Sequence, residues 1–154
     1  MTGVGGPFLK IYTDVYNKLL SSFSVVPPER GAILGSRDGK IVSDFVLDRS
    51  EPEYARAVYT PNIEFLNQQI AEWEVCGIIF CGLLHTHPEN CEKLSLADQR
   101  YISRVMLSFD RETTLLFPVL IPFRKIIPYA ATGSAKKVAV FKTELTLING
   151  VDEQ

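Results

Sequence analysis

The feature that most constrains the fold is an almost unbroken apolar run, VCGIIFCGLLH, over 75–85. Apolar residues that continue in this way without alternation are typical of a strand that is covered on both of its faces. We therefore expect a central strand here, with other elements packed against each side. Such a strand indicates an α/β fold that is built around one mixed sheet.

Three segments have the sequence signals of helices. Between 8 and 23, apolar residues recur at helical spacing along one stripe. A second helix is expected to start with Thr60 as the N-cap and Pro61 in the first helical position. A third helix is expected at about 95–109. The apolar face of the second helix comprises Ile63, Leu66, Ile70 and Trp73.

The remaining apolar segments are typical of strands. The stretch 31–48 contains two of them around an Asp-Gly turn, which predicts a β-hairpin. Two prolines, Pro118 and Pro128, interrupt later segments and push them toward sheet edges or bulges. Three strand-like segments follow the third helix, at 114–121, 125–131 and 136–148.

Composition places the chain in a broad class. Its 154 residues, 46% hydrophobic and 22% charged, suit one soluble globular domain, which we place at 8–150 after a flexible N-terminus at 1–7. A formal net charge of -2 without a basic block argues against a nucleic-acid partner. No apolar stretch reaches the roughly 18 residues that span a membrane. Three cysteines without a CxxC pair, and no visible signal peptide, favour reduced thiols in the cytoplasm.

Both histidines of the chain stand at the end of the predicted central strand. Residues two apart on a strand point to the same side, so His85 and His87 are expected to aim together. Two converging imidazoles are natural ligands for a divalent transition metal, above all zinc. Asp98, in the first turn of the third helix if Ser95 is its N-cap, can supply a third ligand.

A purely structural interpretation of the same residues is also open. Ser95-x-x-Asp98 before an apolar helix has the pattern of a capping box, whose function is to satisfy backbone groups at the helix start. A lone histidine is more often a satisfied surface or core residue than a ligand. The capping and metal-binding interpretations are compatible with each other.

The pattern His85-x-His87-x7-Ser95-x2-Asp98, with Pro88 after the second histidine, resembles the signature of the JAMM (MPN-plus) zinc metalloproteases. The stretch ERGAILGS resembles the upstream glutamate motif of that family, with Glu29 at the glutamate position. The resemblance covers most of the chain and implies the family's cytidine-deaminase-like α/β fold. The short connection after Asp98 is similar to that of the compact prokaryotic members.

The resemblance implies a role for each of these residues. One zinc ion per chain would be held by His85, His87 and Asp98, together with a water molecule. Glu29 would act as general base and then general acid, and Ser95 would donate a hydrogen bond to the oxyanion. Without the resemblance, Glu29 is a solvated carboxylate. Three positions depart from the family's usual pattern: Ala32, Cys91 and Leu94.

The implied activity is hydrolysis of peptide or isopeptide bonds at the tail of a ubiquitin-like or sulfur-carrier protein. A non-catalytic MPN-type scaffold or protein-interaction domain is the alternative, although all five motif positions are intact. A role in DNA maintenance is weakened by the absence of a basic surplus. Nucleobase deamination is disfavoured because the chain lacks the His-x-Glu and Pro-Cys-x-x-Cys motifs of those enzymes.

Overall fold

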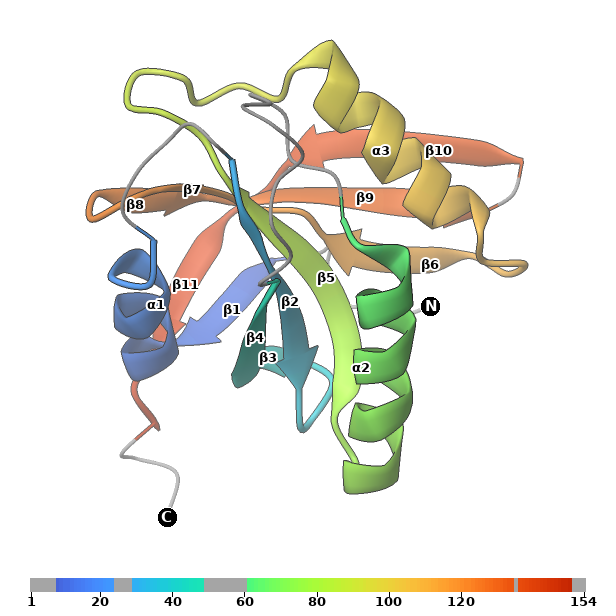
Figure 1. The fold of residues 1–154 in the computed structure, drawn as a ribbon, viewed down its shortest axis with the longest axis horizontal. Coiled ribbons are helices and arrows are strands. Elements are labelled where there is room, and N and C mark those ends of the chain that lie inside the picture. Colours follow the sequence, from blue (N-terminus) through green and yellow to red (C-terminus); the bar gives the residue numbers. More distant parts are fainter. Residues whose placement is uncertain (1–7, 24–28, 49–60, 135, 151–154) are drawn as a thin grey trace.

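The computed structural model describes residues 8–23, 29–48, 61–134 and 136–150. These residues form a single α/β domain, with three helices packed around a mixed sheet (Figure 1). In the described residues the elements follow in the order β1 (Leu9–Tyr12), α1 (Thr13–Leu20), β2 (Gly31–Ser36), β3 (Ile41–Val42), β4 (Asp44–Asp48), α2 (Ile63–Cys76), β5 (Ile79–Thr86), α3 (Leu96–Leu107), β6 (Thr113–Leu116), β7 (Val119–Ile121), β8 (Lys125–Ile127), β9 (Tyr129–Ser134), β10 (Lys137–Lys142) and β11 (Leu145–Ile148).

The strand predicted from the apolar run, β5, lies in the middle of the main sheet. The order of that sheet is β10-β9-β6-β5-β2-β4, and β7 and β8 extend it beside the end of β5. β5 is antiparallel to β2 and parallel to both β6 and β7, which makes the sheet mixed. Gly82 permits close pairing with β6, because a Cβ at this position would lie 2.1 Å from the carbonyl oxygen of Leu116.

Successive residues of β5 point into two different cores. Leu84 packs in a cluster with apolar residues of α1 and β1, whereas Leu83 packs in a cluster with residues of α2 and α3. Figure 1 shows α1 on the opposite side of β5 from α2 and α3. The alternation therefore directs His85 and His87, which continue the series from Leu83, toward the side of the sheet that carries α3.

The predicted first helix is wrong over its first turn. Residues Leu9–Tyr12 form strand β1, and α1 begins only at Thr13. The reason is that Leu9 and Ile11 are each 1% exposed on either side of exposed Lys10, a period of two that the longer helical period concealed. β1 pairs in parallel with β3 and β11 in a second sheet, so the prediction of one sheet is also wrong.

The start and end of α2 also differ from the prediction. Asn62 is the N-cap and accepts a hydrogen bond from the backbone N–H of Phe65, and Pro61 precedes the helix. Thr60, the predicted cap, lies outside the described residues. α2 continues to Cys76 and ends at Gly77, whose φ of 79° is the left-handed conformation that favours glycine. The apolar run therefore contains the end of a helix as well as the central strand.

The other predicted strands are largely confirmed, with more breaks than expected. β2 and β4 form the predicted antiparallel pair, with Gly39 in the turn at a φ of 79° and the short β3 between them. Each of the three later segments contains two strands, and Pro118 and Pro128 fall at two of the breaks. The segment 1–7, predicted to be flexible, lies outside the described residues. No helix in the described part of the chain is long and apolar enough to cross a membrane.

Candidate metal centre

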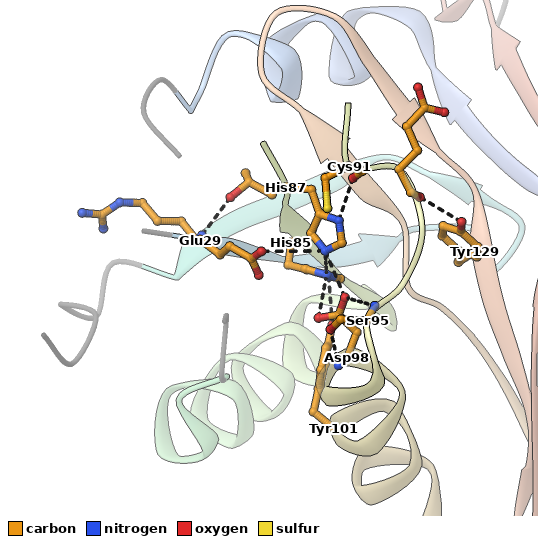
Figure 2. Close-up of polar contacts among 11 residues, drawn as sticks. Glu29, His85, His87, Cys91, Ser95, Asp98, Tyr101 and Tyr129 are labelled. Atoms are coloured by element: carbon orange, nitrogen blue, oxygen red, sulfur yellow. Dashed lines mark hydrogen bonds and ion pairs between the residues drawn. The ribbon is translucent and has the colours of Figure 1, made fainter. Parts of the chain in front are cut away.

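His85 and His87 are held at the buried end of β5. Their backbone N–H groups donate to the carbonyls of Pro118 and Leu120 on the β7 side. Their side chains are 0% and 2% exposed, and the two Nε2 atoms lie 3.0 Å apart. The shared direction expected from their spacing on a strand is thus observed, as Figure 2 shows.

Asp98 reaches the histidines from the first turn of α3. Ser95 is the N-cap of this helix, as predicted: its Oγ accepts from the Asp98 N–H at 3.0 Å, and its own N–H donates to Asp98 Oδ2 at 2.8 Å. The same Oδ2 lies 3.0 Å from His87 Nε2, and Oδ1 lies 3.2 Å from His85 Nε2. The capping box therefore aims the carboxylate at both imidazoles.

Glu29 completes the cluster. Together with Arg30, it immediately precedes β2. Two hydrogen bonds hold this segment beside the end of β5: the Arg30 N–H donates to the side-chain Oγ1 of Thr86, and the Thr86 N–H donates to the Arg30 carbonyl. Glu29 Oε2 lies 3.8 Å from His87 Nε2, and its side chain is 10% exposed. Residues 56 positions apart are thus brought together (Figure 2).

The four side chains form a cluster that could hold a metal ion. Glu29, His85, His87 and Asp98 each offer one ligand atom, and these atoms all lie within 4.8 Å of one another. Imidazole nitrogens with carboxylate oxygens are a donor set that suits a divalent transition metal. Asp98 Oδ1 is buried and accepts no hydrogen bond in the described structure, although it lies 3.2 Å from His85 Nε2. A buried carboxylate oxygen that accepts no hydrogen bond and faces imidazoles is suited to binding a cation.

The cluster shifts the pKa values of its members in opposite directions. Burial would raise the pKa of Asp98, but the contacts with His85 and His87 and the Ser95 N–H hold it well below its ordinary value. Burial lowers the pKa of His85, and the contacts with Asp98 offset only part of this effect. For His87, burial is outweighed by hydrogen bonds to Asp98 and a backbone carbonyl and by the charge of Glu29, so its pKa is raised.

Two groups that the sequence analysis missed contact the outer nitrogens of the histidines. The carbonyl oxygen of Cys91 lies 2.8 Å from His87 Nδ1, and the hydroxyl of Tyr101 lies 3.3 Å from His85 Nδ1 (Figure 2). Helical spacing gave a signal for Tyr101, because a residue three positions after Asp98 lies on the same helix face. The Cys91 contact has no sequence signal, since every residue carries a carbonyl.

The loop that carries the Cys91 carbonyl is tied to the β7–β8 hairpin and β9. The Tyr129 hydroxyl donates to the Glu92 carbonyl at 2.9 Å. Ion pairs join Glu92 to Lys125 at 2.5 Å and Glu89 to Arg124 at 2.8 Å. Exposed ion pairs contribute little stability, roughly 0–1 kcal/mol each. The hydrogen bond and the packing of Leu94 against the buried cluster of Val119, Ile121 and Ile127 therefore do most to hold the loop.

Comparison with solved structures supports the fold alone. The solution structure of protein DSY2949 from Desulfitobacterium hafniense is similar, with a TM-score of 0.63, over 95% of this chain and 98% of that chain. The two sequences are 16% identical, which is too low to transfer a function. The sequence matches no protein-family model, and a search of curated proteins finds no match.

The depressed pKa of Asp98 predicts a pH-dependent contribution to stability. In metal-free protein near neutral pH, we expect Asp98→Asn to lower the free energy of unfolding by about 1–3 kcal/mol, since a charged acceptor in a buried cluster is lost. As pH falls below the ordinary pKa of 3.8, the unfolded chain takes up the proton first, so the contribution disappears. The difference in the free energy of unfolding between wild type and Asp98→Asn must therefore become smaller as the pH falls.

Urea unfolding in the presence of a chelator, repeated at a series of pH values from neutral to acidic, measures the difference in the free energy of unfolding between wild type and Asp98→Asn. Asp110→Asn is the matched control, because Asp110 is an exposed aspartate just beyond α3; its effect on stability should stay within about 0.5 kcal/mol. If Asp98→Asn lowered the free energy of unfolding by the same amount at every pH, Asp98 would not be an ionised carboxylate that its contacts stabilise in the folded protein.

Proposed function

We propose that the protein is a zinc-dependent metalloprotease or isopeptidase, as the JAMM resemblance implies. The observation that carries the proposal is the buried convergence of His85, His87 and Asp98, with Glu29 at the rim of the same cluster. The finer fold assignment, the cytidine-deaminase-like JAMM/MPN fold, is part of this proposal. So is a cytoplasmic location, which the free state of all three cysteines supports.

In this proposal each residue of the cluster has a distinct task. One zinc ion would be held by His85, His87 and Asp98. When bound, zinc would lower the pKa of a coordinated water to about 7 and polarise a substrate carbonyl. Glu29, the most exposed member of the cluster, accepts the proton of the attacking water and returns it to the leaving amine.

The proposal gives Ser95 a second task besides capping α3. Its Oγ accepts the Asp98 N–H through a lone pair, and a hydroxyl that accepts in this way can still donate its proton. In the proposed reaction that proton stabilises the oxyanion that develops on the substrate carbonyl. The substrate class is the C-terminal tail of a ubiquitin-like or sulfur-carrier protein, joined through a peptide or isopeptide bond.

The zinc assignment predicts the metal content of purified protein. We expect about one zinc per chain in wild type and a large loss in His87→Ala and in Asp98→Asn, because three protein ligands are required to hold a catalytic zinc. Elemental analysis after mild purification measures the content. Asp110→Asn is the control and should retain the wild-type amount. Equal zinc in wild type and His87→Ala would remove the ligand assignment.

The general-base role predicts that Glu29→Gln separates metal binding from turnover. The variant should keep its zinc, whereas kcat should fall by roughly 10²- to 10⁴-fold because proton transfer is lost. Turnover is measured on a panel of Gly-Gly-ended small proteins fused to a partner through a peptide or isopeptide bond. Glu64→Gln, an exposed glutamate of α2, serves as the control.

Two results of this assay would redirect the proposal. Zinc-loaded wild type that cleaves no member of the panel would favour the scaffold alternative. Undiminished turnover in Glu29→Gln would exclude this carboxylate as the base.

The two tasks of Ser95 predict two losses of different size in Ser95→Ala. Loss of the cap should lower the free energy of unfolding by about 1 kcal/mol. Loss of an oxyanion donor should lower kcat by roughly 10²- to 10³-fold. Ser108→Ala removes a hydroxyl at the other end of α3, where it bonds to the Val105 carbonyl, and is the control. A stability loss without a loss of kcat would leave Ser95 with the capping role alone.

A further inference from the structure

The Nδ1 atoms of the two histidines, which point away from the centre of the cluster, contact chemically different groups. His87 Nδ1 faces the backbone carbonyl of Cys91 at 2.8 Å, and His85 Nδ1 faces the hydroxyl of Tyr101 at 3.3 Å. Both Nε2 atoms face the centre of the cluster, where they lie 3.0 Å apart. The outer partner of each ring decides which of its nitrogens carries the proton.

The carbonyl behind His87 allows only one role for its ring. A carbonyl oxygen accepts and cannot donate, so His87 Nδ1 must carry a proton. In the neutral ring Nε2 is then an unprotonated lone pair that points at the centre of the cluster. Because Asp98 Oδ2 lies 3.0 Å from His87 Nε2, this nitrogen donates to the carboxylate when it is protonated and can bind a metal ion when it is not.

The hydroxyl behind His85 permits either tautomer. In the metal-free cluster, Asp98 Oδ1 lies 3.2 Å from His85 Nε2, so a proton on this nitrogen faces the carboxylate, and Tyr101 then donates to His85 Nδ1. With a metal on His85 Nε2, the ring proton moves to Nδ1, and the Tyr101 oxygen accepts it. The ring keeps one proton and Tyr101 keeps its own in both states, so only their positions change.

The surroundings of Tyr101 fix its ring firmly enough for this task. The side chain is 2% exposed, and its ring packs edge-on against Phe117, with centroids 6.1 Å apart, and against His85, with centroids 5.7 Å apart. Burial and the charges of Asp98 and Glu29 raise the pKa of Tyr101 well above its ordinary value, so the hydroxyl stays neutral. A neutral phenol can both donate and accept.

We propose that Tyr101 is a positioning residue of the metal centre, which holds the His85 ring in one orientation by reversing the direction of its hydrogen bond when metal binds. The inference rests on the proposed zinc site and adds a residue to it. Tyr101 touches neither the metal nor the substrate in this proposal. It acts through His85 alone.

The test replaces the hydroxyl and keeps the ring, in Tyr101→Phe. Loss of such an outer partner typically weakens metal affinity 10- to 100-fold, so we expect the zinc dissociation constant to rise by about that factor. Competition with a chromophoric chelator measures it. Tyr16→Phe, on α1 in the other core cluster, is the matched control and should bind zinc like wild type.

A second readout separates positioning from general support of the fold. The zinc-induced rise in Tm reports the affinity of the folded protein for zinc, independently of its metal-free stability. A positioning role predicts a smaller zinc-induced rise in Tyr101→Phe than in wild type and in Tyr16→Phe. Equal affinity and an equal zinc-induced rise in all three proteins would overturn the inference, even if the Tm of metal-free Tyr101→Phe were lower.

Nuclear magnetic resonance of wild type provides a test that needs no variant. In zinc-loaded protein labelled with ¹⁵N-histidine, we expect a His85 Nδ1–H proton that is protected from exchange and shows an NOE to the Tyr101 ring. A His85 ring that binds zinc through Nδ1, or an exchanging proton without this NOE, would overturn the inference. Failure of the zinc site itself is recognised separately, because wild type would then bind zinc no better than His87→Ala.

Discussion

The whole cluster depends on where β5 ends relative to its neighbours. β2 pairs along one side of this strand, and β7 takes over from β6 on the other side at the level of His85. Because both backbone edges are paired there, the two histidines cannot rotate out of the face that α3 covers. The same pairing brings Arg30, and therefore Glu29, beside the strand end through Thr86. Sheet register thus supplies three of the four members of the cluster, and one helix turn supplies the fourth.

Much of this arrangement could be read from local sequence patterns. Period-two spacing gave the shared direction of His85 and His87, and the Ser-x-x-Asp pattern gave the start of α3 and the position of Asp98. The central location of β5 followed from its unbroken apolar character. These inferences succeeded because each depends on residues that are close together in the sequence.

The features that escaped prediction depend on distant partners. The strand β1 forms because β3 and β11 offer it hydrogen bonds and a buried face. The short alternation within Leu9–Tyr12 does not identify these partner strands. The break at Gly77 was missed because an apolar helix end and an apolar strand share one composition. The Cys91 carbonyl became important through the fold of its loop, which is held by Tyr129, a residue of β9. Tertiary context decided each of these cases.

The two interpretations of Asp98, as part of a helix cap and as a metal ligand, concern different oxygen atoms of its carboxylate. Oδ2 accepts the Ser95 N–H that closes the capping box, at 2.8 Å, and this bond fixes the orientation of the carboxylate. Oδ1 receives no hydrogen bond in the described structure, and it faces the imidazoles at the centre of the cluster. A helix that needed only a cap would gain nothing from burying a second, unsatisfied oxygen, which costs roughly 1–3 kcal/mol or more for a charged group. The capping interaction therefore explains how the carboxylate is aimed, and a cation held by the proposed metal centre would account for the burial of its other oxygen without a hydrogen bond.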